Sequence, residues 1–349
     1  MQALVLAGGE GTRLRPLTLT LPKPVLPLAG RPFLSYMLDW LREHGVEEAI
    51  LSCGFRSDDV RRVLGDIYDG MRLRYVVEDE PLGTAGPLRL ALDQGVLEQR
   101  LLVLNGDCLT DIDLTAEVAQ HERTGARVTL ALAAVEHTAG YGVVPTDADD
   151  RVEAFLEKTA GEVPTNRINA GAYVLEREVV EALIPAGRAV SFEREVFPAL
   201  VGDGLYGYAA EGYWIDIGTP ERYLEATFDL LAGAPVSRLA PRDETGSLIA
   251  DGCLVSGAHV GPQCVLGAQC SVGVGSTVER SVLHERVRVG SDCSVREAVL
   301  AAGARIGDGA RIEPGAMVGA GASIGAGCAV GAGARVAPDA VLEAGGRVA

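Results

Sequence analysis

A glycine-rich turn followed by three cationic side chains stands near the start of the chain and could bind a polyphosphate. Gly8, Gly9 and Gly11 end or follow the apolar run 2–8. Backbone N–H groups at such glycines can approach phosphate oxygens closely. The turn is not a Rossmann fingerprint, because the third glycine is missing, and it is not a Walker loop, because no Gly-Lys-Ser/Thr follows. An ordinary strand-to-helix turn would also use glycines. The basic side chains favour phosphate, and they are Arg13, Arg15 and Lys23.

Lysine is rare in this chain, which makes its position in the same segment informative. Of the 31 basic residues, only Lys23 and Lys158 are lysines. A compact ammonium and a forked guanidinium bind anions with different geometries and are not interchangeable. We therefore expect that Lys23 contacts an anion whose geometry suits an ammonium. The alternative is that a lysine stands at this position by chance.

Two aspartates at the ends of apolar runs form a candidate magnesium site. Asp107 ends Asn-Gly-Asp (105–107), and Asp216 lies within the segment 214–218. Mg²⁺ in enzymes is often held by one or two carboxylates together with substrate phosphates. Taken singly, Asp107 could cap a helix and Asp216 could occupy a turn. The seven cysteines show no zinc-ligand spacing.

Predicted strands and helices alternate along the first part of the chain, and they would position these residues. Apolar runs predict strands at 2–8, 49–54, 72–78, 100–107 and 126–135. Helical periodicity predicts helices at 32–45, 57–65, 84–95 and 114–124. This alternation is typical of an α/β fold with a doubly wound, mostly parallel sheet. Ligands of such sheets bind at the carboxyl ends of the strands, where the candidate residues lie.

The last hundred residues carry a repeat of six. Aliphatic residues keep this spacing from Leu248 to Val278 and again from Leu300 to Leu342, with two one-residue slips between the two runs. No helix places every sixth residue on one face, but a triangular parallel coil does. The pattern resembles a hexapeptide-repeat left-handed β-helix of about five or six coils. We therefore predict a catalytic domain at 1–232, a linker at 233–246 and a β-helix domain at 247–349, which we expect to mediate homo-oligomer formation.

Composition excludes several classes of partner. The chain has 349 residues and a net charge of −17, which argues against binding to nucleic acid or to an anionic membrane. No stretch of 18 apolar residues is present, and the amino terminus has no signal-peptide pattern. The cysteines stand in apolar settings without pairs, as expected for buried thiols in the cytoplasm.

The opening segment resembles the signature of sugar-1-phosphate nucleotidylyltransferases, GGxGTRLxPLTxxxPKPxLP. This resemblance implies that Arg13 clamps the triphosphate and stabilises departing pyrophosphate, and that Lys23 contacts phosphate. It implies that Asp107 and Asp216 hold Mg²⁺. Nucleotide contacts are implied for the turn itself, at Leu6, Ala7, Gly8, Gly9, Gly11 and Thr12.

Further motifs extend the resemblance to the sugar site. The segment 155–159 resembles F-x-E-K-P, in which Glu157 would bind sugar hydroxyls and Lys158 the sugar phosphate. Thr159 replaces the proline of that motif, which leaves the rigidity of the turn open. Segments 141–144 and 168–175 match motifs that would bring Gly142 and Asn169 to the sugar. Arg194 could reach phosphate, although a solvated helix face is the favoured interpretation.

The segment 78–88 is expected to bind the base. Guanine presents two adjacent donors, and a carboxylate such as Glu78 can accept both. A solvated acidic turn is the alternative interpretation. Gly83 and Thr84 lie in the same segment, for which the resemblance implies nucleotide contacts. Several motifs together look most like mannose-1-phosphate guanylyltransferases, which implies that GTP and mannose-1-phosphate give GDP-mannose and pyrophosphate. A thymidylyl- or uridylyltransferase acting on glucose-1-phosphate is the alternative.

Two other classes of function stay open at the sequence level. A non-catalytic regulatory paralogue would bind nucleotide-sugar, but it would be expected to lose at least one residue of the phosphate and metal sites. An acyltransferase activity of the β-helix would need a histidine such as His259 or His284. No general base is expected in the transfer reaction, since the attacking phosphate oxygen is already an anion.

Overall fold

Four parallel strands form the centre of the sheet in the computed structural model, which describes residues 1–157, 163–235, 237, 239 and 242–349. The strand order is β7–β1–β4–β6. Leu4 pairs with Ile50 on one side and with Val103 on the other, and all three are fully buried. Burial on both faces explains why β1, β4 and β7 are continuous apolar runs, whereas β6 alternates and exposes Arg72 and Arg74. Their bounds are β1 (Gln2–Leu6), β4 (Glu48–Cys53), β6 (Met71–Val77) and β7 (Arg100–Asn105).

Antiparallel strands extend this centre. The expected strand at 126–135 is β9 (Val128–Ala134), but it does not join the parallel centre. Instead β12 (Arg167–Glu176) lies between β7 and β9 and runs antiparallel to both. The sheet is therefore mixed. The remaining strands are β5 (Ile67–Tyr68), β10 (Gly142–Val143), β11 (Leu156–Glu157) and β13 (Leu205–Ala209), and outside this sheet β2 (Pro27–Leu28), β3 (Arg31–Pro32), β8 (Cys108–Thr110) and β14 (Trp214–Asp216).

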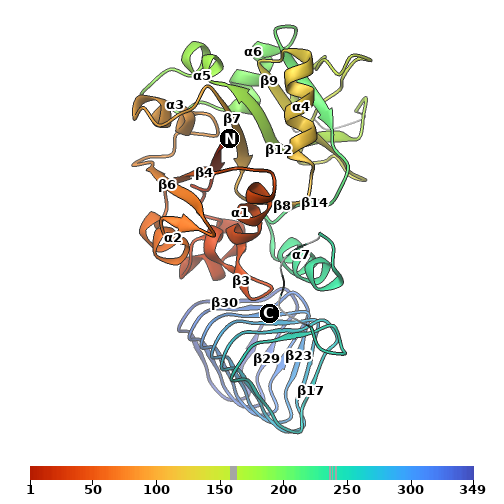
Figure 1. Ribbon diagram of the computed structural model, residues 1–349. Coiled ribbons are helices and arrows are strands. Elements are labelled where there is room, and N and C mark those ends of the chain that lie inside the picture. The colour runs from red at the N-terminus through yellow and green to blue at the C-terminus, as the bar shows by residue number, and fades with distance from the viewer. Residues whose placement is uncertain (158–162, 236, 238, 240–241) are drawn as a thin grey trace. The chain divides into compact units, whose positions relative to one another are not determined.

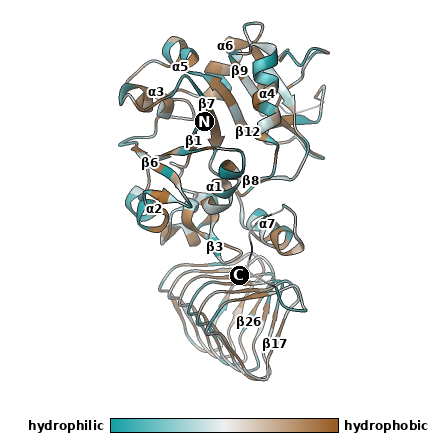
Figure 2. Cartoon of the chain, viewed as in Figure 1, coloured by the Kyte–Doolittle hydropathy of each residue, from teal (hydrophilic) through white to brown (hydrophobic). Residues whose placement is uncertain are grey.

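Helices cover the sheet, and those predicted lie within two residues of their expected bounds. Figure 1 shows α4 lying along β9 and β12. Asp113 caps this helix by accepting a hydrogen bond from the N–H of Ala116 (3.0 Å), and Gly125 ends it in the left-handed region. In Figure 2 strands β7 and β9 are hydrophobic, whereas α4 carries both kinds of residue. The helices are α1 (Phe33–Glu43), α2 (Ser57–Leu64), α3 (Gly86–Asp93), α4 (Leu114–Thr124), α5 (Arg177–Leu183), α6 (Phe197–Leu200) and α7 (Pro220–Ala232).

Short helical turns connect these elements at functionally interesting places. Three 3₁₀ turns follow one another in the glycine-rich opening segment, and a π-type turn precedes α6. They are η1 (Thr12–Leu14), η2 (Leu17–Leu19), η3 (Lys23–Val25) and η4 (Phe192–Val196).

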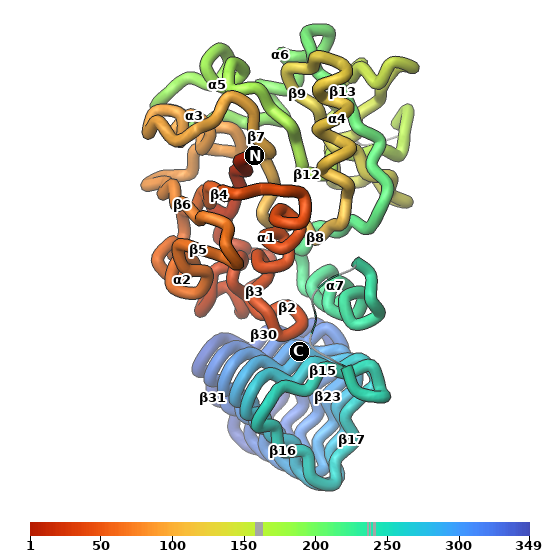
Figure 3. The backbone as a smooth tube through the Cα atoms, in the orientation of Figure 1, coloured from red at the N-terminus to blue at the C-terminus, as the bar shows by residue number. Residues whose placement is uncertain are grey.

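The six-residue repeat forms three parallel sheets of six strands, which confirms the predicted number of coils. Figure 3 shows the coils stacked on one another. Strands of the first sheet are β15 (Leu248–Ile249), β18 (Val265–Leu266), β21 (Val282–Leu283), β24 (Val299–Leu300), β27 (Met317–Val318) and β30 (Arg335–Val336). Those of the second are β16 (Leu254–Val255), β19 (Ser271–Val272), β22 (Arg288–Val289), β25 (Arg305–Ile306), β28 (Ser323–Ile324) and β31 (Val341–Leu342). Those of the third are β17 (His259–Val260), β20 (Thr277–Glu279), β23 (Ser294–Arg296), β26 (Arg311–Ile312), β29 (Ala329–Val330) and β32 (Arg347–Val348).

Register explains where the repeat slips. Val278 pairs with Val295 and Val295 with Ile312, whereas Ile306 pairs with Ile324, one residue further along. The slips therefore reflect shorter coils in the stretch between Leu266 and Ile312. The first coil departs from the prediction that every spaced aliphatic residue points inward. Leu254 keeps the spacing but is 71% exposed, because it pairs with Ser271, whereas its neighbour Val255 pairs with the buried Val272.

The chain divides into two compact units. The first comprises Met1–Gly9 and Met37–Trp214, and the second Glu10–Tyr36 and Ile215–Ala349. The opening segment from Glu10 therefore packs with the β-helix part of the chain. The domain boundaries at 232 and 246 stay predictions, and part of the predicted linker lies outside the described residues.

Candidate active site

The turn after β1 lies directly beside the turn after β7. The N–H of Gly106 donates to the carbonyl of Leu6 (2.9 Å), and a Cβ atom at residue 106 would lie 2.7 Å from that oxygen. On the other side, the N–H of Ala7 donates to the carbonyl of Ser52 (2.8 Å). Gly8 and Asp107 therefore leave the sheet at the same edge, as the parallel topology predicts.

Glu78 follows β6 and is held in place by two groups. The hydroxyl of Ser52 donates to Oε1 (2.7 Å), and the N–H of Leu82 donates to Oε2 (3.0 Å). A Cβ atom at Gly8 would lie 3.0 Å from Oε1, so the carboxylate lies against the glycine turn. Glu78 is half-buried and fixed, which disagrees with the alternative of a solvated acidic turn. The sequence reasoning missed Ser52, although a polar residue near the end of an apolar strand was a usable signal.

Gly83 and Thr84 are attached to the segment before α6. Gly83 has φ 76°, and a Cβ atom there would lie 2.5 Å from the carbonyl oxygen of Val190. The hydroxyl of Thr84 donates to Oε2 of Glu193 (2.7 Å) and accepts from the N–H of Phe192 (2.9 Å). These contacts order the segment 78–88, and the predicted nucleotide contacts of Gly83 and Thr84 stay predictions.

Arg194, considered above as a phosphate contact, is exposed on this same segment. Its backbone N–H donates to the hydroxyl of Ser191 (3.3 Å), which caps η4. This placement is in line with the favoured interpretation of a solvated helix face.

Three predicted sugar residues lie on adjacent strands. Gly142 on β10 pairs with Glu157 on β11, and the neighbouring Val143 pairs with Ile168 on β12, next to Asn169. A Cβ atom at residue 142 would lie 3.2 Å from Oε2 of Glu157. The carboxylate therefore lies over the glycine. Lys158, the next residue, lies outside the described residues.

The side chain of Asn169 is oriented by its own strand. Its Nδ2 donates to the Tyr173 hydroxyl (3.0 Å), and its Oδ1 accepts from the N–H of Gly171 (3.0 Å). A carboxamide has two N–H groups and two acceptor lone pairs, so these contacts use half of its capacity. Nearby, the indole N–H of Trp214 donates to the carbonyl of Ala170 (2.7 Å), which attaches the start of the 214–218 segment to β12.

In the second unit, Gly11 allows close packing of the opening segment. Gly11 has φ 61°, and a Cβ atom there would lie 2.9 Å from Cγ2 of Thr18 and 3.4 Å from Cβ of Lys23. The Thr18 hydroxyl donates to the carbonyl of Gly11 (2.9 Å). Lys23 is only 8% exposed. Burial of this kind is unusual for lysine and indicates a fixed ammonium position.

Arg13 is exposed, but its guanidinium packs on the main chain of the 214–218 segment. A Cβ atom at Gly218 would lie 2.7 Å from Nη2 of Arg13. Gly218 stands two residues after Asp216, so the second unit brings Arg13 to the segment that carries this aspartate. The sequence reasoning missed Gly218. Its signal was a glycine at the end of the segment already singled out for Asp216.

Asp107 and Asp216 are both half-buried and belong to different units. Within the first unit, the carbonyl of Tyr213 accepts from the hydroxyl of Thr110 (2.7 Å) and from the N–H of Asp111 (3.2 Å). Tyr213, three residues before Asp216, thus lies beside Thr110 and Asp111, which follow Asp107. Among the described ranges, no group of three or more His, Cys, Asp or Glu side chains is arranged for a metal ion.

The two histidines considered for an acyltransferase differ in environment. His259 is exposed, whereas His284 is 4% exposed. The Tyr223 hydroxyl donates to the carbonyl of Pro27, and it lies 3.1 Å from Nε2 of His284. Since a carbonyl can only accept, Nε2 of His284 must carry the proton that the hydroxyl accepts. Burial lowers the pKa of His284 to about 4, so the ring is neutral. His284 therefore anchors Tyr223.

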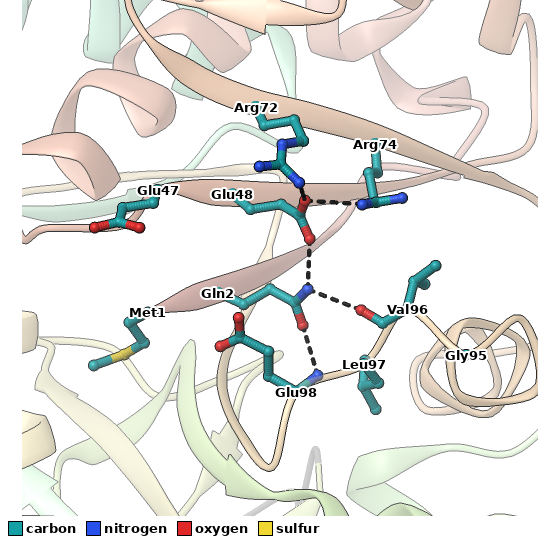
Figure 4. A pocket seen from close by; sticks show the side chains of 10 residues that line it. All are labelled: Met1, Gln2, Glu47, Glu48, Arg72, Arg74, Gly95, Val96, Leu97 and Glu98. Atoms are coloured by element: carbon teal, nitrogen blue, oxygen red, sulfur yellow. Dashed lines mark hydrogen bonds and ion pairs between the residues drawn. The ribbon is translucent and has the colours of Figure 1, made fainter.

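A cavity lies at the opposite edge of the sheet, where the parallel strands begin (Figure 4). Its volume is about 380 Å³. The carboxylate of Glu48 accepts from Gln2 (2.7 Å), Arg74 (2.9 Å) and Arg72 (3.0 Å). Burial alone would raise the pKa of Glu48, but these hydrogen bonds and the two positive charges outweigh it and lower the pKa. This network joins β1, β4 and β6, which indicates a structural role.

Comparisons with known proteins match two parts of the chain to known families. The family described as Nucleotidyl transferase matches residues 2–233. Residues 240–320 match the family GlmU-like, C-terminal hexapeptide, and residues 303–338 match Bacterial transferase hexapeptide (six repeats). In the described ranges, no helix is long and apolar enough to cross a membrane.

Individual relatives cover most of the chain. A Mannose-1-phosphate guanylyltransferase from Mycobacterium tuberculosis is 42% identical over 300 residues, which are 84% of this chain and 83% of that protein. A Mannose-1-phosphate guanyltransferase from Schizosaccharomyces pombe is 35% identical over 279 residues, covering 77% and 74%. The crystal structure of HddC from Yersinia pseudotuberculosis matches with a TM-score of 0.56 and 28% identity, covering 66% of this chain and 99% of that one. The same protein is known complexed with GMP-PN. The chain therefore belongs to the nucleotidyl transferase family, as its opening segment predicts, and carries a hexapeptide-repeat domain of the bacterial transferase type.

Proposed function

We propose that this enzyme transfers a guanylyl group from GTP to mannose-1-phosphate, giving GDP-mannose and pyrophosphate. The observation that carries the proposal is the fixed carboxylate of Glu78 beside Gly8. Two of its acceptor directions are used by Ser52 and Leu82, and others remain to accept the N1–H and N2–H₂ groups of guanine. The names of the relatives and the GMP-PN complex of the Yersinia protein support the same choice.

The reaction needs positioning and charge neutralisation rather than a general base. An oxygen of the sugar phosphate attacks the α-phosphorus, and the bond from that phosphorus to the β-phosphate oxygen breaks as pyrophosphate leaves. The backbone of Leu6, Ala7, Gly8, Gly9, Gly11 and Thr12, with the side chains of Arg13 and Lys23, would hold the triphosphate. The sugar would be held at Gly142, Glu157 and Asn169, and Lys158 would contact its phosphate.

Magnesium fits the carboxylates that this chain offers. Asp107 and Asp216 are half-buried acidic groups. Within the first unit, Tyr213, three residues before Asp216, is bonded to Thr110 and Asp111, which follow Asp107. Carboxylate pairs completed by phosphate oxygens are a usual Mg²⁺ ligand set. We propose that these two aspartates hold the ion, which when bound would offset the negative charge of the phosphates.

A homo-oligomer through the β-helix is also part of the proposal. Aliphatic side chains of its first coils are exposed, including Leu254 (71%) and Val274 (60%). Clustered exposed aliphatic groups often mark interfaces. Leu254→Glu is expected to shift the mass measured by light scattering to a smaller species, and an unchanged mass would exclude this face. We also propose a cytoplasmic location, in line with seven free and mostly buried cysteines.

The test is pyrophosphate release with Mg²⁺ across GTP, UTP, dTTP, ATP and CTP, each with mannose-1-phosphate and glucose-1-phosphate. We expect the highest kcat/KM with GTP and mannose-1-phosphate. Preference for dTTP or UTP with glucose-1-phosphate would overturn the assigned specificity but keep the reaction class. Release with no pair would favour a regulatory nucleotide-sugar-binding protein, and acetyl-CoA consumption would reveal an acyltransferase.

A further inference from the structure

An arginine of the β-helix reaches the main chain of the phosphate-binding segment. Arg335 begins β30, and its Nη1 donates to the carbonyl oxygen of Arg15 (2.6 Å) and to that of Arg13 (3.3 Å). Both carbonyls belong to the end of η1, where a helical turn leaves acceptors that its own hydrogen bonds do not use. All three residues belong to the same compact unit. One guanidinium group thus contacts the backbone on both sides of Leu14.

The surroundings of Arg335 connect this contact to the candidate metal segment. A cavity of about 390 Å³ is lined by η1, by Arg335 and by the first turn of α7, which begins four residues after Asp216. Glu221 in that turn feels the positive charge of Arg335, although hydrogen bonds from its own N–H and from Thr219 contribute more to lowering its pKa. Arg335 is therefore placed between the arginine turn and α7.

We infer that Arg335 is a positioning residue for the nucleotidyl transfer, which holds the η1 main chain so that the Arg13 guanidinium stays on Gly218. The inference rests on the proposed function. Arg13 is exposed, and its side chain alone would have many accessible rotamers. The main chain at Gly218 restricts the positions that the Arg13 guanidinium can take. The hydrogen bond from Arg335 to the Arg13 carbonyl restricts the movement of the Arg13 backbone. Nη1 of Arg335 donates to both carbonyls, and the rigid planar guanidinium fixes the directions of its N–H groups, which a freely rotating ammonium does not.

The kinetic test compares three variants. Arg335→Ala is expected to lower kcat about tenfold and to raise the KM for GTP, because small displacements of a clamping group are costly. The KM for mannose-1-phosphate should stay unchanged. Arg335→Lys should recover part of the loss. Arg311→Ala is the matched control, since Arg311 also begins a β-helix strand with an exposed side chain, and it should behave like the parent. Loss of folded protein alone would lower the apparent kcat and leave both KM values unchanged, and that result would overturn the inference.

A double-mutant cycle decides whether Arg335 acts through Arg13. In an Arg13→Ala background, Arg335→Ala should change kcat/KM by less than about twofold, because the group to be positioned is gone. A further loss equal to that in the parent enzyme would overturn the inference.

Hydrogen exchange gives a readout that does not need activity. The N–H groups of Leu14 and Arg15 donate within η1, to Gly11 and Thr12. They are expected to exchange several-fold faster in Arg335→Ala and at the parent rate in Arg311→Ala. Equal exchange in all three proteins would overturn the inference even if no nucleotide were turned over. Failure of the proposed function alone would appear as faster exchange without pyrophosphate release from any substrate pair.

Discussion

Single side chains in the candidate site are oriented by groups that come from other parts of the sequence. Glu78 depends on Ser52 and Leu82, and Asn169 depends on Tyr173 and Gly171. A side chain that is already fixed loses little conformational entropy when it binds a ligand. These contacts therefore support a preorganised site, and their effect can be tested one residue at a time.

Replacing Arg13 should lower the rate much more than the stability. Arg13→Ala is expected to reduce kcat by about 10²–10³-fold, because a donor that stabilises charge in the transition state is lost. The thermal midpoint should change little, since the side chain is exposed. Steady-state kinetics and a melting curve measure both effects. The kcat of Arg13→Lys should lie between those of the parent and Arg13→Ala, because lysine keeps the positive charge but lacks the two-pronged guanidinium. A kcat equal to the parent's in both variants would show that Arg13 has no role in the mechanism.

Replacing Glu78 should weaken the choice of guanine. ITP lacks the 2-amino group of GTP, so the parent enzyme should favour GTP, and Glu78→Gln should reduce this preference about tenfold. The ratio of kcat/KM for GTP and ITP is the measurement. Glu80→Gln is the matched control, because Glu80 lies on the same segment and is exposed. An unchanged ratio in Glu78→Gln would assign base recognition to another group.

At the scale of elements, the site depends on places where two backbones approach closely. The turns after β1 and β7 touch at Leu6 and Gly106, and the segment 78–88 touches the chain before α6 at Gly83 and Val190. A methyl group at either glycine would meet a carbonyl oxygen of another element. These glycines are needed because of their neighbours in space.

A pair of alanine substitutions separates this steric effect from backbone strain. Gly83 and Gly95 both have positive φ, but only a Cβ atom at Gly83 would meet another backbone. Gly95→Ala is expected to cost about 1 kcal/mol from strain, and Gly83→Ala about 1–3 kcal/mol more from overlap with Val190. Thermal unfolding of both variants measures the difference. Equal midpoints would mean that the 190 segment moves away freely.

At the scale of the whole molecule, the hexapeptide coils do more than extend the chain. The second unit combines them with the opening segment, through Arg335 at η1 and through His284 and Tyr223 at Pro27. Conditions that disturb the first coils should therefore also disturb the opening segment, which we propose binds phosphate. Acid is such a condition, because His284 is buried and neutral.

The stability of this unit should fall between pH 6.5 and about 4. The pKa of His284 is lowered to about 4, so in this range the unfolded chain binds a proton that the folded chain does not, and stability decreases as pH falls. The accumulated loss is on the order of 3 kcal/mol near pH 4. His284→Gln keeps a donor toward Tyr223 and should show a flatter dependence. Thermal midpoints measured across this range in both proteins test the assignment, and parallel curves would contradict it.

Local patterns carried much of the architecture. Apolar runs predicted the four central strands, of which β1, β4 and β7 are buried on both faces. The period of six predicted the coils, since each hexad supplies one inward side chain. The opening segment predicted the family. The insertion of β12 between β7 and β9 did not follow from the runs, because an antiparallel strand buried on both faces has the same composition as a parallel one.

The sequence by itself therefore determined the fold class, the repeat and the residue types of the candidate site. Only the tertiary structure decided which partners hold them: Ser52 and Leu82 for Glu78, Gly218 and Arg335 for Arg13, and Tyr223 for His284. The physical reason is that strand, helix and hexad periods are properties of neighbouring residues. Hydrogen bonds between segments far apart in the chain depend on how those segments pack.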